Sequence, residues 1–337
     1  MIFKALNMRC NNCGTDNDIN SRYCKRCGSS LYSNVGVHHT TRKSRMSPLK
    51  LILIAVLVIF VALSAVTAYI VYVDTSPSEI LYLNNKNPGD VTSNSELAAN
   101  IPDTALSRQI IDAAKQGVPV YKIGDGKGPV TVISAGVHGD QLVPTVASMK
   151  LINYLDGRKI NGTVYIIPFT SPSALSKNTK LTDGVNLNTV ADKDGTTSND
   201  IIKLAQSSNA SAVADFHETQ AGKNPGRTTI MCSQVPTPGS FQLAQDMSSL
   251  SLDTTLTYYV AGVEYEGAIE DVSNINGIPA VTPIVLVSSH GKVYHSAVGE
   301  SYNQMLALLI ANHNLNPNDS YLQLANVDID GWDSLSR

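Results

Sequence analysis

Four cysteines near the N-terminus have the spacing of a metal site. Cys10 and Cys13 form one CxxC pair, and Cys24 and Cys27 form a second pair ten residues later. Each CxxC turn supplies two soft thiolates from one tight loop, and four thiolates complete a tetrahedral zinc site. Because no coordination position stays open, this zinc is predicted to be structural. Two disulfides are the alternative, which a reducing cytoplasm disfavours. Residues 8–32 are therefore predicted to be a zinc ribbon.

Two histidines further along the chain follow apolar, strand-like runs. VTVISAG at 130–136 leads into His138, and AVADF at 212–216 leads into His217. Ligands gather at the carboxyl ends of strands in α/β sheets, so this pair is a candidate for a second metal site. Asp215 falls on the same side of an extended strand as His217, where a carboxylate can fix the tautomer of a ligating imidazole. The competing interpretation is two unrelated surface histidines.

The charges divide the 337-residue chain into two parts. Residues 1–50 contain nine Lys and Arg residues against two acids, a net charge of +7, whereas the remainder carries −10. Hydrophobic residues make up 43% of the chain, which is enough for a packed core and excludes wholesale disorder or a collagen-like repeat. We therefore expect two chemically different compartments.

An apolar run lies between the two parts. Residues 51–73 contain no charge, Gly or Pro, and as a helix they extend about 34 Å, enough to cross a bilayer core. A buried core helix is the alternative, but no polar stripe is present. The basic juxtamembrane segment 33–50 precedes the run, so the positive-inside rule predicts a single-pass protein of the cell membrane. Its N-terminus is expected in the cytoplasm and residues 74–337 outside. The flanking bases are Arg42, Lys43, Arg45 and Lys50.

The partners of these segments follow from their chemistry. One transmembrane helix implies contact with the lipid bilayer. The basic region around the ribbon offers contacts to anionic lipid, nucleic acid or a protein. A flank that only sets topology is favoured over nucleic-acid binding, and the cytoplasmic partner is not specified by the sequence.

The outer part alternates helix-like and strand-like segments. Residues 74–100 are rich in Asn, Ser, Pro and Asp and are predicted to be a stalk or linker, and residues 315–337 a polar C-terminal tail. Between them, residues 101–314 are predicted to form one α/β domain with a mixed, largely parallel sheet flanked by helices. Helices are expected at 106–117, 143–155, 201–208, 241–250 and 302–313, and strands at 118–124, 130–136, 163–169, 212–216, 228–232, 256–260 and 279–287.

Four motifs of the outer part, GVHGDQ, VNLNTV, DFHET and IPAVTPIVL, resemble the zinc carboxypeptidase superfamily in order and spacing. The resemblance covers about residues 118–312 and is strongest to the succinylglutamate desuccinylase/aspartoacylase-like branch. It implies hydrolysis of an amide bond with one zinc, which an HGxE motif and a later histidine hold. An Asn-Arg pair binds the substrate carboxylate, and a Glu on a late strand activates water. The resemblance makes His138 and His217 zinc ligands.

The other functional positions of that family are altered. The ligand Glu falls on Gln141, the Asn-Arg pair on Asn188 and Thr189, and the general-base Glu on Ile284. A neutral amide oxygen cannot neutralise zinc, and a Thr cannot clamp a carboxylate as Arg does. Ile284 cannot take a proton, a role worth typically 10²–10⁴-fold in rate.

Nearby acids offer replacements. Asp140 is a candidate oxygen ligand, and four glutamates are candidate bases. Three of these glutamates, together with Asp271, are otherwise predicted to be a solvated acidic loop. The candidate bases are Glu218, Glu264, Glu266 and Glu270.

Three functions therefore remain open for the outer domain. The preferred hypothesis is a pseudoenzyme, a degenerate carboxypeptidase-like domain that binds peptide-like or cell-surface ligands. The second is an active zinc-dependent amide hydrolase of peptidase or N-acyl deacylase type. The third is a structural signalling scaffold.

Overall fold

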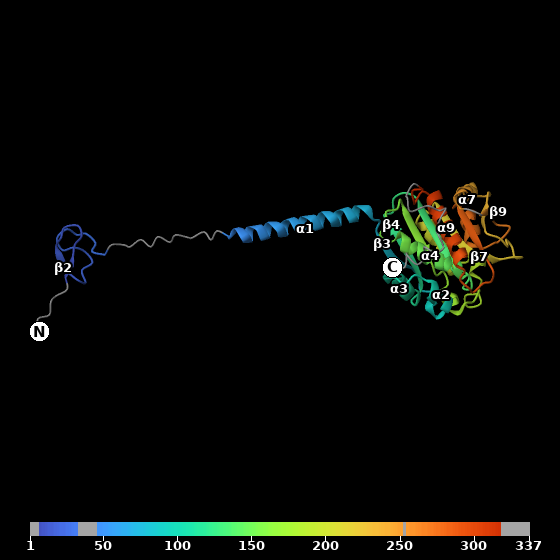
Figure 1. Cartoon of the computed structure of the whole chain (residues 1–337), viewed down its shortest axis with the longest axis horizontal. Helices are drawn as coiled ribbons and strands as arrows, with labels where there is room; N and C mark the ends of the chain where they lie inside the picture. The colour runs from blue at the N-terminus through green and yellow to red at the C-terminus, as the bar shows by residue number, and fades with distance from the viewer. Residues whose placement is uncertain (1–6, 33–45, 252–253, 318–337) are drawn as a thin grey trace. The chain divides into compact units, whose positions relative to one another are not determined.

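The structure is a computed structural model that describes residues 7–32, 46–251 and 254–317. Most of the basic segment 33–50 and of the tail 315–337 lies outside the described residues. The chain divides into two units, Met1–Ser64 and Ala65–Arg337, which we describe separately (Figure 1).

The N-terminal unit begins with two small knuckles. Strand β1 (Asn7–Arg9) pairs antiparallel with β2 (Asp16–Asp18). In each knuckle the N–H of the glycine after the second cysteine bonds back to the first cysteine's carbonyl: Gly14 to Cys10 and Gly28 to Cys24, both at 2.9 Å. The two glycines have φ angles of +72° and +69°, a region that other residues enter only with strain. The CxxC turns are therefore built for close approach of their thiols.

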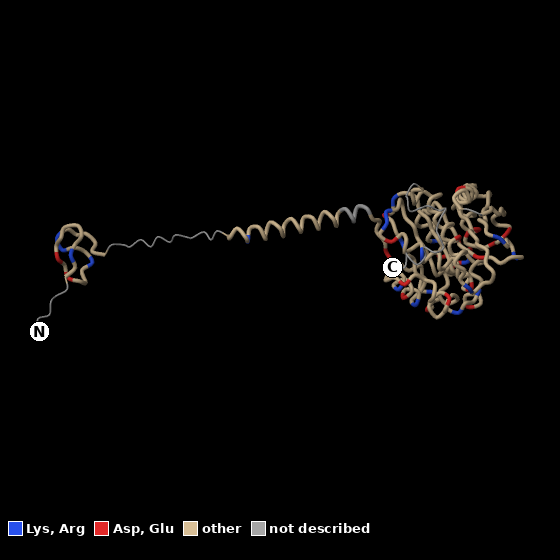
Figure 2. Tube along the Cα trace, viewed as in Figure 1, with Lys and Arg blue, Asp and Glu red and all other residues tan. Residues whose placement is uncertain are grey.

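Helix α1 (Pro48–Asp74) carries the apolar run. Its segment Pro48–Tyr69 has a mean hydropathy of 3.0 and buries none of its surface in the protein. Figure 2 shows the described helix without charge beyond its basic start. Among the described residues this is the one helix long and apolar enough to cross a membrane.

The second unit is built on an eight-stranded sheet of order β3-β4-β6-β5-β7-β10-β8-β9. The pairs β6–β5, β5–β7, β7–β10 and β8–β9 are parallel, whereas β3–β4, β4–β6 and β10–β8 are antiparallel. The predicted fold class, a mixed and mostly parallel sheet flanked by helices, is confirmed. The strands are β3 Ser78–Asn84, β4 Val118–Gly124, β5 Val130–Ala135, β6 Thr163–Ile167, β7 Ala212–Gln220, β8 Thr229–Ser233, β9 Thr255–Tyr259 and β10 Ala280–Val287.

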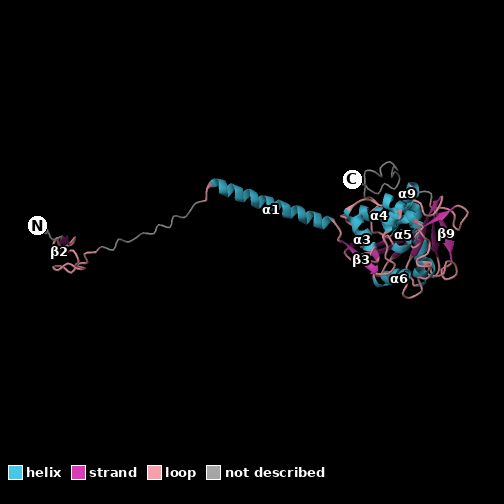
Figure 3. Cartoon of the chain, turned by 90° about the horizontal axis from the view of Figure 1, so that it is seen from below, coloured by secondary structure: helices cyan, strands magenta, loops and turns pink. Residues whose placement is uncertain are grey.

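Helices cover both faces of this sheet. The larger hydrophobic core lies under α3, α4, α7 and α9, and a smaller one lies under α6 and α8. Figure 3 shows α3, α4 and α9 on one side of the sheet and α6 on the other. Strand β5 is buried along its whole length between them. The helices are α2 Ser95–Asn100, α3 Ala105–Ala114, α4 Leu142–Leu155, α5 Pro172–Lys177, α6 Thr197–Ser207, α7 Pro238–Leu250, α8 Ile269–Ile275 and α9 His295–Ala311, with 3₁₀ turns η1 Val91–Ser93 and η2 Leu187–Thr189.

The segment predicted to be a stalk is part of the folded unit, so that prediction is wrong. Residues 78–84 form β3, which pairs antiparallel with β4 at one edge of the sheet. Ile80 packs on the larger core, and Leu81 and Leu83 pack on the smaller one. The short alternating run SEILYLN supplies this apolar surface, although Asn, Ser and Pro dominate the composition around it.

Strand β7 is longer than the predicted AVADF run. It continues to Gln220 because the parallel ladder to β10 pairs His217 with Ile284 and Gln220 with Val287. The polar HETQ residues are therefore held in extended conformation by their neighbour. His217 lies inside the strand and not in the loop beyond it.

Candidate functional sites

The four ribbon cysteines converge on one point. Their sulfur atoms all lie within 4.8 Å of one another, with Cys10 Sγ 3.6 Å from Cys27 Sγ and Cys13 Sγ 3.4 Å from Cys24 Sγ. All four are free thiols. A cluster of four thiols at this spacing fits tetrahedral zinc.

Hydrogen bonds favour the thiolate form of two of these cysteines. The Ser29 hydroxyl, 3.2 Å from Cys27 Sγ, and the Ser29 N–H lower the pKa of Cys27 to about 6. The N–H groups of Cys27 and Arg26 lower the pKa of Cys24. Zinc binds the thiolate, so these donors favour metal binding by Cys24 and Cys27, whereas the pKa of Cys10 is raised to about 11 within the cluster.

Asn17, which sequence reasoning missed, connects the two knuckles. It is buried, its Nδ2 donates to the Thr15 carbonyl at 2.8 Å and to Cys24 Sγ at 3.7 Å, and its Oδ1 accepts from Lys25 N at 2.9 Å. The signal that the sequence offered for this role was a polar residue between the two CxxC pairs. Asn17 orients a ligand, as outer-shell partners of metal sites do.

In the second unit, Ala65–Arg337, which we call the outer unit, the structure brings His138 and His217 together. Their ring centroids are 5.3 Å apart, and both side chains are buried. His138 follows β5, and His217 lies in β7, the neighbouring parallel strand. Asp215 Oδ2 lies 2.7 Å from His217 Nε2. The two histidines therefore share one site near the carboxyl ends of β5 and β7.

The loop that carries His138 packs closely against α5. A Cβ on Gly139 would come within 2.2 Å of the Ala174 backbone, so only glycine fits there. His138 Nδ1 is buried without a hydrogen-bond partner among the described residues. Burial, followed by the neighbouring His217, Lys180 and His290, lowers the pKa of His138 to about 2. The imidazole of His138 is therefore neutral.

Gln141 completes this arrangement from the start of α4. Its Oε1 lies 2.8 Å from His217 Nδ1 and accepts the N–H of Glu218 at 3.3 Å. Both ring nitrogens of His217 thus face oxygens of the protein. The amide oxygen is uncharged, and the four ribbon cysteines are the one described group of three or more Cys, His, Asp or Glu with ligand atoms within 4.8 Å. The outer site therefore offers two imidazoles and a neutral amide oxygen in place of the two imidazoles and one carboxylate that the HGxE motif implies.

A buried carboxylate and a third histidine lie beside this pair. Glu218 Oε1 is 2.9 Å from His290 Nδ1, and Oε2 accepts the N–H of Val143 in α4 at 3.1 Å. Burial raises the pKa of Glu218, and the hydrogen bond to Glu218 raises the pKa of His290. Sequence reasoning missed His290, although SSHG follows the carboxyl end of β10. Glu218 is the candidate base that lies at this site, but its side chain is sealed from solvent.

The remaining family positions lie in different surroundings. Ile284 is buried and packs with Met231 and Tyr259. Asn188 and Thr189 form part of η2, where the Thr189 hydroxyl donates to a backbone carbonyl and the side chain is exposed. Asp140 accepts the N–H of Gly291 through its backbone carbonyl at 2.7 Å, while its Oδ1 is buried without a partner in the described structure.

The acidic segment after β9 is only partly solvated, so the prediction of a solvated loop is wrong for two residues. Glu264 and Glu266 are exposed, but Glu270 and Asp271 are buried in the first turn of α8. Asp271 accepts the N–H groups of Gly262 at 2.7 Å and Gly267 at 3.2 Å. Burial, and then the charge of Asp271, raises the pKa of Glu270 well above its usual range. Glu270 and Asp271 are buried because helix α8 packs on the sheet.

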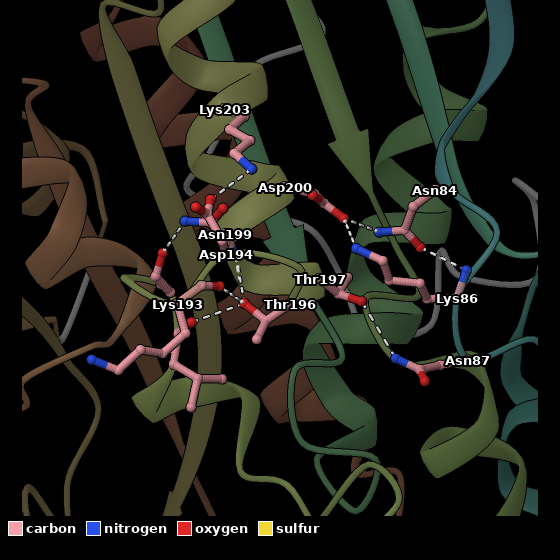
Figure 4. A network of polar contacts seen from close by, with 12 residues as sticks. Asn84, Lys86, Asn87, Lys193, Asp194, Thr196, Thr197, Asn199, Asp200 and Lys203 are labelled. Carbon is pink, nitrogen blue, oxygen red and sulfur yellow. Dashed lines mark hydrogen bonds and ion pairs between the residues drawn. The ribbon is translucent and has the colours of Figure 1, made fainter.

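A separate cavity of about 350 Å³ lies between β3, β4, β6 and α6, lined by apolar side chains that include Leu83, Tyr165 and Leu204. The polar network at its rim is paired within itself (Figure 4). Asp200 accepts from Asn84 Nδ2 and Lys86 Nζ, both at 2.7 Å. The candidate residues of the His138 site do not line this cavity.

Comparisons with known proteins agree with the motifs. Residues 127–231 match the model of the Succinylglutamate desuccinylase/Aspartoacylase catalytic domain, which confirms the resemblance for the segment that carries His138 and His217. No curated protein matches the chain significantly.

Similar solved structures include an aspartoacylase family protein from Mesorhizobium loti (20% identity, 59% of this chain and 62% of that chain covered, TM-score 0.47). They also include a succinylglutamate desuccinylase from Silicibacter sp. TM1040 (18%, 61% and 64%, 0.48) and a metallo-carboxypeptidase from Burkholderia cenocepacia (11%, 69% and 64%, 0.47). The chain spans less than two thirds of the length of each of these relatives.

Proposed function

We propose that this chain is a membrane-anchored protein whose outer unit, related to the succinylglutamate desuccinylase/aspartoacylase catalytic domain, binds a peptide-like or cell-surface ligand without hydrolysing it. The observation that carries the proposal is the loss of a carboxylate at two positions beside His138 and His217. Gln141 stands where a ligand carboxylate is expected, and Ile284, opposite His217 in the ladder, packs against Met231 and Tyr259.

Both positions matter for hydrolysis of an amide. The family's zinc site includes one anionic ligand, whereas here the oxygen that faces His217 Nδ1 belongs to the neutral amide of Gln141, so zinc affinity should be lower. A water molecule needs a base, and an isoleucine in apolar contact cannot accept its proton. Polar groups such as Gln141 and His290 remain at the site to contact a ligand, but without the two family carboxylates both zinc binding and proton abstraction from water are weakened.

Zinc content and turnover of the purified full chain test this function. We expect one zinc per chain, bound by the ribbon, and no cleavage of N-acyl amino acids or carboxypeptidase substrates above the level of His138→Ala. Replacing Cys10 and Cys13 with Ser serves as the control, because it should remove the bound zinc. Two zinc ions per chain together with turnover that His138→Ala abolishes would overturn the proposal.

A second candidate function, an active amide hydrolase, is favoured by one observation. Glu218 orients His290 through Nδ1, and His290 acts electrostatically on His138, so a carboxylate-held imidazole adjoins the histidine pair. In the same assay this function requires turnover that His290→Gln removes. Equal background rates for the natural chain and His290→Gln would reject it.

The anchoring itself makes a separate prediction. With α1 across the membrane and its basic flank inside, protease added to intact cells should remove the outer unit and spare the ribbon. Immunoblots against the two ends of the chain give the measurement, and permeabilised cells give the control in which both ends are cut. Loss of the ribbon with retention of the outer unit would reverse the orientation, and full release by carbonate would exclude the span.

A further inference from the structure

The ribbon exposes large apolar side chains on its second knuckle. Tyr23, Tyr32 and Ile19 are 66%, 54% and 48% exposed. The Tyr32 hydroxyl donates to the Ile19 carbonyl at 3.4 Å, so these two lie together. Tyr23 pairs antiparallel with Ser30 in an isolated bridge, which brings its segment beside the one that leads to Tyr32.

Three basic residues lie next to these apolar residues in the sequence. Arg22, Lys25 and Arg26 are exposed and form no ion pair with an acid of the described ribbon. The ribbon has four bases and two acids, so with a formal −2 for zinc and four thiolates it is neutral overall. Any attraction to an anion is thus local to this knuckle and to the basic segment 33–50.

We propose that this face, formed by Ile19, Tyr23, Tyr32, Arg22, Lys25 and Arg26, binds the anionic lipid headgroups of the membrane that α1 crosses. The inference rests on the anchoring proposed above. Tyrosine rings favour the bilayer interface, and Lys and Arg are attracted to anionic lipid.

The covalent connection between the ribbon and α1 favours lipid over other anionic partners. Residues 33–47 join the ribbon to α1 and span at most about 50 Å when fully extended. The ribbon is therefore held at high effective concentration beside the headgroups, so even weak contacts keep it bound. Nucleic acid also binds basic and aromatic surfaces, but nothing tethers it to the ribbon.

Amine labelling of the full chain in lipid nanodiscs tests the contact. One set of discs contains phosphatidylcholine alone, and the other contains phosphatidylcholine with phosphatidylglycerol. We expect acylation of Lys25, measured by mass spectrometry, to slow at least about threefold in the anionic discs and to recover at high salt. Lys223 of the outer unit, which is exposed after the carboxyl end of β7, gives the internal reference, which should not change.

Variants separate the contacts made by the tyrosines from those made by the basic residues. Tyr23→Ser with Tyr32→Ser, and Arg22→Gln with Arg26→Gln, should each reduce the protection of Lys25. Arg9→Gln removes a charge from the other knuckle and should not. Zinc content confirms that each ribbon is folded.

Three results would overturn the inference. These are equal labelling of Lys25 in both discs, protection that neither double variant reduces, and protection by duplex DNA or RNA but not by anionic lipid. A chain that fails to co-elute with the discs would instead overturn the anchoring, so the two failures are distinguishable.

Discussion

Removal of zinc is expected to unfold residues 7–32 and to leave the outer unit folded. The described ribbon buries few side chains, chiefly Cys10, Cys24 and Asn17, and so has almost no apolar core of its own. Structural zinc in such peptides supplies about 10–16 kcal/mol at pH 7, and that binding free energy is also the folding free energy. The outer unit has an eight-stranded sheet with two cores and does not depend on this metal.

Thiol reactivity measures the effect. In chelator, four cysteines should become fully reactive toward a thiol reagent, while Cys232 stays protected because it is buried and burial raises its pKa to about 12. Cys13→Ser should give the same exposure without chelator. Slow, unchanged reactivity of the ribbon thiols in strong chelator would contradict a zinc-dependent fold.

Gln141→Glu is expected to create zinc binding in the outer unit. The new carboxylate would occupy the place of an oxygen that now lies 2.8 Å from His217 Nδ1, and His138 Nδ1 already offers a neutral, unpartnered donor. An anionic ligand should raise zinc affinity by at least the roughly 10–100-fold that outer-shell partners contribute. Calorimetric zinc titration of chains whose ribbon is already loaded gives the measurement.

Two variants control for charge alone. Ile284→Glu adds a carboxylate among Met231 and Tyr259, so it should lower the midpoint of thermal unfolding without adding a zinc site. Gln141→Glu combined with His217→Ala should lose the gain. Tight zinc binding by the outer unit of the natural chain would show that Gln141 is a sufficient ligand and would contradict this account.

The sequence predicts best what depends on local pattern. Cysteine spacing defined the ribbon because the metal needs only the two turns, and apolar runs located the central strands because they are buried on both faces. The His138–His217 contact could be anticipated because each residue comes directly after a buried apolar run, and those runs form the neighbouring strands β5 and β7.

What the sequence did not predict depends on distant partners. Strand β3 is held by β4, so its polar surroundings concealed it. Glu270 and Asp271 are buried because α8 packs on the sheet, and no local signal distinguishes them from Glu264 and Glu266. His290 joins the site through Glu218, 72 residues away along the chain.

Under the proposed anchoring, the short connection between α1 and the outer unit limits where that unit can meet the proposed ligand. The helix ends at Asp74, and Ser76 is already fixed: its N–H donates to the Arg158 carbonyl, and its hydroxyl accepts the N–H of Ile160, both at 3.0 Å. With α1 in a bilayer, the single connecting residue, Thr75, keeps the outer unit at the membrane surface. The unit then diffuses laterally together with its transmembrane helix. Encounters then occur in a thin layer, and their rate depends on how densely a ligand is displayed on the surface more than on its concentration in the surrounding fluid.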